Sequence, residues 1–190
     1  DHVTAHDAAS GRELWRAGGL NPGRERFFRS IASPVLAGDL VIAPYARGAT
    51  LTAIRRGGSG DVTGSHVAWT RRDLGTDVPT PVVAGDRIWL CNDKGHVASV
   101  DAASGAPRWQ GDLPKHRLAY SCSPVLADGR LVFIREDGHA TILRAGDALE
   151  VLGTGEVDGA LTVATPVCVD GRVLVRTVDA LWCFALRPPG

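Results

Sequence analysis

Three predicted loops concentrate the side chains of this chain that could bind an anion. Guanidinium and ammonium groups hold carboxylates and phosphates through charge-assisted hydrogen bonds, and a nearby tyrosine adds a hydroxyl donor. We therefore expect a site for an anionic small molecule or a protein partner on the face that these loops share. The candidate residues are Arg29, Tyr45, Arg47, Lys115, His116, Arg117 and Tyr120. The alternative interpretation is a solvated loop face, because cations and anions nearly balance over all the loops of that face.

The cysteines and histidines form no recognisable catalytic or metal-binding motif. Cys91, Cys122, Cys168 and Cys183 are widely spaced, and none lies at metal-ligand spacing from a histidine. We expect these cysteines to be small buried side chains, with one disulfide left open as an alternative. We expect no metal site and no catalytic residue, because nucleophile-elbow, zinc-protease and phosphate-loop motifs are missing. The glycine-rich stretch 57–60 is expected to be a flexible linker with no helix after it.

Composition excludes two classes of partner. The chain has 190 residues with 21 Lys and Arg against 21 Asp and Glu, so it carries no net positive field for nucleic acid. No apolar run approaches the roughly 20 residues of a membrane-spanning helix. The first residues lack the charged and apolar segments of a signal peptide, so we expect none in this chain.

A repeat of about 42 residues organises the elements that must position these loops. Each copy starts with Ser/Thr-Pro-Val, and the prolines at 34, 81, 124 and 166 are 47, 43 and 42 residues apart. Short apolar runs follow, separated by turns rich in Gly, Asp and Asn, which predicts β-strands joined by hairpins. No segment longer than ten residues shows the 3.6-residue period of an amphipathic helix.

Four short antiparallel strands in each repeat predict an all-β fold made of β-propeller blades. A single four-stranded sheet cannot cover both of its faces, whereas blades stacked around an axis cover one another. We expect residues 1–190 to form a partial propeller of between four and five blades. The expected parts are the end of a blade at 1–19, full blades at 32–75, 76–118 and 119–159, and three strands of a further blade at 160–190.

Two copies of the sequence D-A-A-S-G-x-x-x-W lie 94 residues apart, at Asp7 to Trp15 and Asp101 to Trp109. The Asp accepts backbone N–H bonds in a tight turn, and the Gly takes a positive φ. We expect Trp15, Trp69 and Trp109 on outermost strands, each flat against a neighbouring blade, where an indole buries about 150–250 Å². These three residues are therefore expected to be structural docking residues.

The D-x-x-S/T-G-x-x-x-W element and the repeats around it resemble the pyrroloquinoline quinone (PQQ)-like repeat family of β-propellers over almost the whole chain. The resemblance implies an exported bacterial protein, periplasmic or extracellular, with a ring of seven or eight blades. This family includes quinoprotein alcohol dehydrogenases and a propeller lipoprotein of the outer-membrane β-barrel assembly machinery. The dehydrogenases use an adjacent cysteine pair and Ca²⁺, and this chain has no such pair. We therefore expect no cofactor, and PQQ and calcium belong only to the alternative of an oxidoreductase.

A ring of seven or eight blades needs about 300–340 residues, more than this chain supplies. We expect the missing blades to come from a longer gene product, of which this is a C-terminal fragment, or from a second copy of the chain. The predicted function is a non-catalytic binding or scaffold module. The alternatives are a fragment of a PQQ-dependent, quinoprotein-like oxidoreductase and an envelope assembly scaffold.

Overall fold

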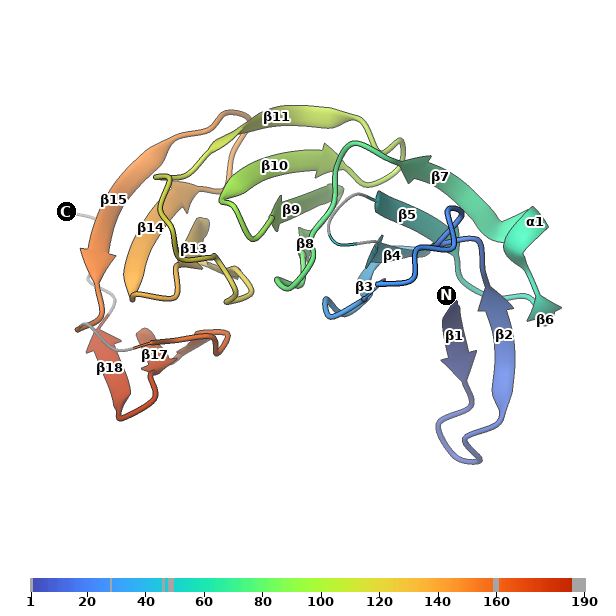
Figure 1. Ribbon diagram of the computed structural model, residues 1–190, viewed down its shortest axis with the longest axis horizontal. Coiled ribbons are helices and arrows are strands. Elements are labelled where there is room, and N and C mark those ends of the chain that lie inside the picture. Colours follow the sequence, from blue (N-terminus) through green and yellow to red (C-terminus); the bar gives the residue numbers. More distant parts are fainter. Residues whose placement is uncertain (1, 28, 46, 48–49, 159–160, 186–190) are drawn as a thin grey trace.

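Five small β-sheets follow one another along an open arc in the computed structural model (Figure 1). The structure describes residues 2–27, 29–45, 47, 50–158 and 161–185. The all-β architecture of blade-like sheets that the repeats predict is confirmed. The blade boundary expected at residues 159 and 160, and the tail 186–190, lie outside the described residues. Within the described part of the chain, no helix is both long enough and apolar enough to span a membrane.

Three of the sheets are complete blades, in which strands pair antiparallel in chain order. The first comprises β3 (Val35–Ala37), β4 (Leu40–Tyr45), β5 (Thr50–Arg55) and β7 (Val67–Arg71). The second comprises β8 (Val82–Ala84), β9 (Arg87–Cys91), β10 (His96–Asp101) and β11 (Pro107–Asp112). The third comprises β12 (Val125–Ala127), β13 (Arg130–Ile134), β14 (His139–Arg144) and β15 (Val151–Glu156). The first strand of each blade lies toward the inside of the arc and the last strand toward the outside (Figure 1).

The sheets at the two ends of the arc are incomplete, so the chain holds between four and five blades. At the N-terminal end, β1 (Val3–His6) and β2 (Glu13–Ala17) form a hairpin that corresponds to the two outer strands of a blade. At the C-terminal end, the sheet has three strands that correspond to the inner strands of a blade. These are β16 (Val167–Val169), β17 (Arg172–Arg176) and β18 (Leu181–Ala185).

Asp-Gly pairs close the first hairpin of two blades. Asp128 and Gly129 have φ values of 47° and 70°, and Asp170 and Gly171 have φ values of 48° and 68°. Two successive residues with positive φ are the requirement of a two-residue type I′ turn, whose twist matches that of the flanking strands. Local residue chemistry is therefore enough to set the register of these hairpins.

The segment between β5 and β7 contradicts the prediction of a flexible linker with no helix after it. Strand β6 (Gly60–Asp61) pairs in parallel with β2, and a one-turn helix, α1 (Thr63–His66), follows directly. The Gly18 amide donates to Thr63 Oγ1 at 2.7 Å, and the Val62 amide donates to the Arg16 carbonyl at 2.8 Å. Sequence reasoning missed this element because hydrogen bonds to a strand about 45 residues away hold it in place.

The core lies between successive sheets. Ile42 and Leu51 of the first blade pack in one cluster with Ile88 and Leu90 of the second, and all four are fully buried. Both faces of a central sheet are covered in this way, so five consecutive residues of β5, from Thr50 to Ile54, are buried. Because both faces are covered, even the polar residues Thr50 and Thr52 of this strand are buried.

The last sheet has no neighbour beyond it within the described residues. Val167, Val169 and Leu181 are 53%, 46% and 69% exposed, although the equivalent residues of the inner blades are largely covered. Leu36, on the first strand of the first full blade, is also 62% exposed, because the N-terminal hairpin lacks the two inner strands of its blade. The open arc therefore presents apolar side chains at both ends.

Candidate functional site

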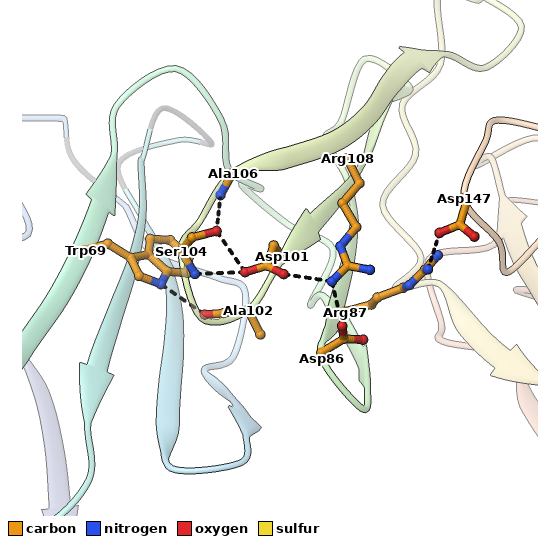
Figure 2. Close-up of polar contacts among 9 residues, drawn as sticks. All are labelled: Trp69, Asp86, Arg87, Asp101, Ala102, Ser104, Ala106, Arg108 and Asp147. Atoms are coloured by element: carbon orange, nitrogen blue, oxygen red, sulfur yellow. Dashed lines mark hydrogen bonds and ion pairs between the residues drawn. The ribbon is translucent and has the colours of Figure 1, made fainter.

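The indole of Trp69 lies against the following blade. Its Nε1–H donates a hydrogen bond of 3.0 Å to the carbonyl of Ala102, in the turn between β10 and β11 (Figure 2). A Cβ atom added at Gly105 of that turn would lie 2.7 Å from the indole ring, and Gly105 has a φ of 72°. The glycine is thus required twice, for the positive φ and for the close approach of the indole.

Trp109 repeats this contact at the next blade, whereas the equivalent positions in two other sheets differ. Trp109 Nε1 donates to the Gly146 carbonyl at 3.0 Å, in the turn between β14 and β15. Trp15 is 5% exposed and belongs to the same buried cluster as Val62. Its neighbour is therefore the segment before α1, and not a turn like that at residues 101–105. At the fourth such position, opposite Ile142 of β14, Gly153 stands in place of the tryptophan. The three tryptophans thus lie on outer strands at junctions between sheets.

A network of charges supports the docking turn (Figure 2). Asp101 accepts hydrogen bonds from the Ser104 amide at 2.9 Å and the Ser104 hydroxyl at 2.8 Å, and Arg108 reaches it at 2.7 Å. Arg108 also pairs with Asp86 at 2.5 Å. Arg108 and Ser104 hold the pKa of Asp101 down at about 2. Arg87 forms an ion pair with Asp147 of the next sheet, so the network crosses the junction.

The loop-face candidates fall into separate groups in the structure. Arg29 is bound to Asp77, which is 95% buried: the Arg29 Nη2 atom lies 2.5 Å from a carboxylate oxygen. Arg47 Nε donates to the Phe27 carbonyl at 3.0 Å. These two arginines therefore fasten the loop after the N-terminal hairpin to the first and second blades. Arg29 already has a carboxylate partner and offers no free charge to a ligand.

The two tyrosines of the predicted site are core residues. Tyr45 is 7% exposed and packs in the cluster of Val3 and Ile54, and burial raises its pKa. Tyr120 is 2% exposed, its hydroxyl donates to the Pro114 carbonyl at 3.2 Å, and burial raises its pKa as well. Both rings are thus buried, and contact of these tyrosines with a ligand stays a prediction.

Lys115, His116 and Arg117 do lie together. They line an open depression of about 620 Å³ with the β9–β10 turn, which contributes Lys94 and His96. The loop is held over this turn by two backbone bonds: the Leu113 amide donates to Gly95 at 2.8 Å and the Tyr120 amide to Asp93 at 2.9 Å. Sequence reasoning left Lys94 and His96 out of the candidate set, although the repeat places their turn at the same end of the blade.

The charges in this depression are partly compensated. His96 contacts Asp112 at 2.9 Å and Gln110 at 3.0 Å, and the Lys115 Nζ atom lies 3.9 Å from Asp112. His116 lies 3.6 Å from Asp137, whose carboxylate is paired with Arg135 at 2.8 Å. The Arg135 guanidinium holds the pKa of Asp137 at about 2. A net positive surface remains around Lys94, Lys115 and Arg117.

All four cysteines are free thiols. Cys91 and Cys122 are buried, and burial raises the pKa of Cys91 strongly and that of Cys122 to about 11. A thiol with a raised pKa is a poor nucleophile at neutral pH, because the thiolate is the reactive form. Among the described residues, no group of three His, Cys, Asp or Glu side chains could hold a metal ion.

Comparison with known proteins identifies the family of this arc of sheets. The family described as outer membrane protein assembly factor BamB matches residues 1–147 and, in a second alignment, 61–185. The chain belongs to this family. Outer membrane protein assembly factor BamB from Salmonella typhimurium is 30% identical over 148 residues, which are 77% of this chain and 34% of that protein. The chain thus spans about a third of the length of this curated relative.

Solved structures share the fold. BamB from Moraxella catarrhalis superposes with a TM-score of 0.70 at 16% identity, over 97% of this chain and 52% of that one. The computationally designed protein Ika8 superposes with a TM-score of 0.73 at 14% identity, over 96% of this chain and 52% of that one. The chain therefore corresponds to about half of each of these solved chains.

Gly105 and Gly11 offer a matched test of the docking contact. Both occupy the same position of the repeated turn, with φ values of 72° and 69°, but an added Cβ meets Trp69 only at Gly105 and nothing within 4 Å at Gly11. Gly11→Ala should cost about 1–2 kcal/mol for the left-handed backbone. Gly105→Ala should cost about 1–3 kcal/mol more because of overpacking. Urea denaturation measures both values, and equal losses would contradict the docking role of this turn.

The Asp101 network predicts a loss of stability in acid. The folded pKa of about 2 lies below the usual unfolded value of about 3.9, so the carboxylate stabilises the fold above that value. This stabilisation should be lost progressively as the pH falls from about 4 toward 2. Asp101→Asn should be less stable at pH 7 and should show a flatter decline over this range. Asp170→Asn, in an exposed turn, is the control, and an unchanged acid profile for Asp101→Asn would refute the assignment.

Proposed function

We propose that this chain is part of a non-catalytic β-propeller scaffold that binds a protein partner in the bacterial cell envelope. The observation that carries the proposal is the family match, which extends over both halves of the chain. The relatives are named as outer membrane protein assembly factors, and a role in the assembly of envelope proteins is the function that this similarity supports. An envelope location, in the periplasm or on the outside of the cell, rests on the same similarity.

The depression at Lys115 is the surface of the described chain that best suits a partner. Its walls come from two connections that backbone hydrogen bonds hold together, so the cationic side chains are presented on a stable support. The Lys115 side chain is 83% exposed and its ion pair with Asp112 is long, at 3.9 Å. Exposed pairs of this kind contribute little energy, so the ammonium group is free to turn to a carboxylate on a partner. An acidic protein segment or a small anionic ligand fits this surface.

The oxidoreductase alternative does not fit the residues of this chain. The resemblance to quinoproteins implies an adjacent cysteine pair beside PQQ, and here the four cysteines lie at 91, 122, 168 and 183. Cys168 and Cys183, the closest pair in sequence, lie on different strands and are paired with Val173 and Leu174, whose side chains point to opposite faces of the sheet. No step of quinone chemistry can be assigned to this arrangement.

We propose that the remaining blades belong to the same gene product. The solved relatives are about twice as long as the matched part, as this proposal requires. Closure by a second copy meets an obstacle, because β1 and β18 both correspond to the third strand of a blade. Two copies would bring these strands to one position in the ring. We expect the isolated chain to be a monomer of 20.0 kDa in analytical ultracentrifugation, and a stable particle of twice that mass would contradict this assignment.

Site-specific crosslinking in the bacterium that encodes the chain tests the scaffold function. A photoreactive residue at position 117, in the full gene product, should capture an envelope protein. The pair of substitutions Lys115→Glu and Lys94→Glu should reduce this crosslink about tenfold, because each reverses a charge in the depression. The control is a photoreactive residue at position 170, in the β16–β17 turn at the opposite end of the strands.

Three outcomes would contradict the proposed function. The first is equal crosslinking from positions 117 and 170, which would indicate random collisions. The second is dye-linked dehydrogenase activity of the purified gene product that depends on added PQQ and Ca²⁺. Deletion of the gene should lower the amounts of assembled outer-membrane proteins, and an unchanged outer-membrane protein profile would contradict the assembly role.

A further inference from the structure

An open pocket lies where the first docking indole meets the first full blade. It has a volume of about 760 Å³, and its two walls are residues 12–15 of the N-terminal hairpin and residues 56–60 of the insertion. We name this depression the rim pocket. At the next junction the corresponding space is filled, because an added Cβ at Gly105 would lie 2.7 Å from the Trp69 ring. At Gly57 and Gly60 an added Cβ would meet nothing within 4 Å. Trp15 itself is buried, and the insertion leaves open space beside it at Gly57 and Gly60, although Gly58 packs against Val62 and His66.

The charged side chains of the rim pocket that are free to bind a ligand are cations. Arg12 has no side-chain partner within the described part of the chain. Among the residues that the structure describes, the Arg56 side chain pairs with Asp39 at 3.3 Å, and these side chains are 60% and 88% exposed. The one acidic side chain of the walls, Glu13, is held by Arg16 through two bonds of 2.6 and 2.8 Å. Two guanidinium groups are therefore available to a carboxylate ligand, since an exposed pair such as Arg56–Asp39 is weak.

One wall of the rim pocket is a free strand edge. Strands β2 and β6 pair only at Trp15–Gly60 and Arg16–Asp61, and toward the pocket no further pairs form between the two segments. The outer edge of β2 at Glu13 and Leu14 thus has no strand partner among the described residues. Figure 1 shows β6 beside β2 at the outside of the arc. An unpaired edge with an open space beside it accepts an additional strand through main-chain hydrogen bonds.

We propose that the rim pocket binds an extended acidic peptide. The peptide adds to the free edge of β2 at Glu13 and Leu14, and its carboxylate is held by Arg12 and Arg56. The side chain of Leu14, which is 37% exposed, provides an apolar contact for a neighbouring peptide residue. An extended peptide fits better than a small anion, because the pocket combines cations with a strand edge and is far larger than one carboxylate.

This site is independent of the surface assigned to the envelope partner. Both walls come from the described chain, and β2 corresponds to the outermost strand of its blade, so the pocket stays on the outer rim when further blades complete the ring. The crosslinking experiment at position 117 does not involve these residues. If one proposal fails, the other can still be tested by its own experiment.

Fluorescence anisotropy with labelled peptides tests the rim pocket on the full 190-residue chain. The probe is an eight-residue peptide of alternating Val and Thr with two central Glu residues, and its counterpart carries Gln at the same positions. The Glu peptide should bind more tightly than the Gln peptide. Arg12→Gln and Arg56→Gln should each weaken its binding about tenfold, the equivalent of one charge-assisted hydrogen bond.

Two controls separate charge attraction from strand addition. Arg72→Gln removes an exposed cation that follows β7, at the end of this strand away from the 56–60 insertion, and should leave the dissociation constant unchanged. A Glu peptide with alternate amides N-methylated keeps its charge but loses edge hydrogen bonds, and should bind at least about tenfold more weakly. The proposal is overturned by absence of peptide binding, by equal affinity of the Glu and Gln peptides, or by full binding of the methylated peptide. Equal losses in all three arginine variants would also overturn it.

Discussion

Every blade of this protein has two apolar faces and therefore needs a neighbour on each side. Fully buried side chains such as Ile88 and Leu143 lie between sheets, so the sheet is not an independent folding unit. Apolar burial contributes roughly 25 cal/mol per Å², and it is available to a blade only when the next blade is in place. The arc and the exposed apolar residues at its ends follow from this constraint.

Apolar stacking alone would allow blades to slide against each other, and directed polar contacts fix their positions. The indoles of Trp69 and Trp109 each donate to one backbone carbonyl of the following sheet, and the ion pair of Arg87 and Asp147 spans the second of these junctions. At the first of these junctions, the contact depends on the turn residue Gly105, which leaves room for the Trp69 ring. Where the insertion takes the place of this turn, an open pocket lies beside the buried indole of Trp15, and in the third blade Gly153 stands in place of the tryptophan.

Residues that hold the blades together are not available to a ligand, and this limits where binding can occur. Strand residues and docking turns hold the blades together. Several loop cations are also held in ion pairs, such as Arg29 with Asp77 and Arg135 with Asp137. Exposed cations line two open depressions, one around Lys115 and the other the rim pocket at Arg12. Both lie on segments that backbone hydrogen bonds hold in position, which favours binding over mobile loops.

The repeats, the Asp-Gly turns and the alternation of short apolar runs determine the strands and the blade fold, because each of these signals acts between residues close in sequence. The same local logic placed the three tryptophans on outer strands. It could not show that Tyr45 and Tyr120 are buried, that Arg29 is neutralised by a residue 48 positions away, or that residues 60–66 fold onto β2. Those outcomes depend on the curvature that stacking imposes on the sheets, and only the tertiary structure decides which distant side chains that curvature brings into contact.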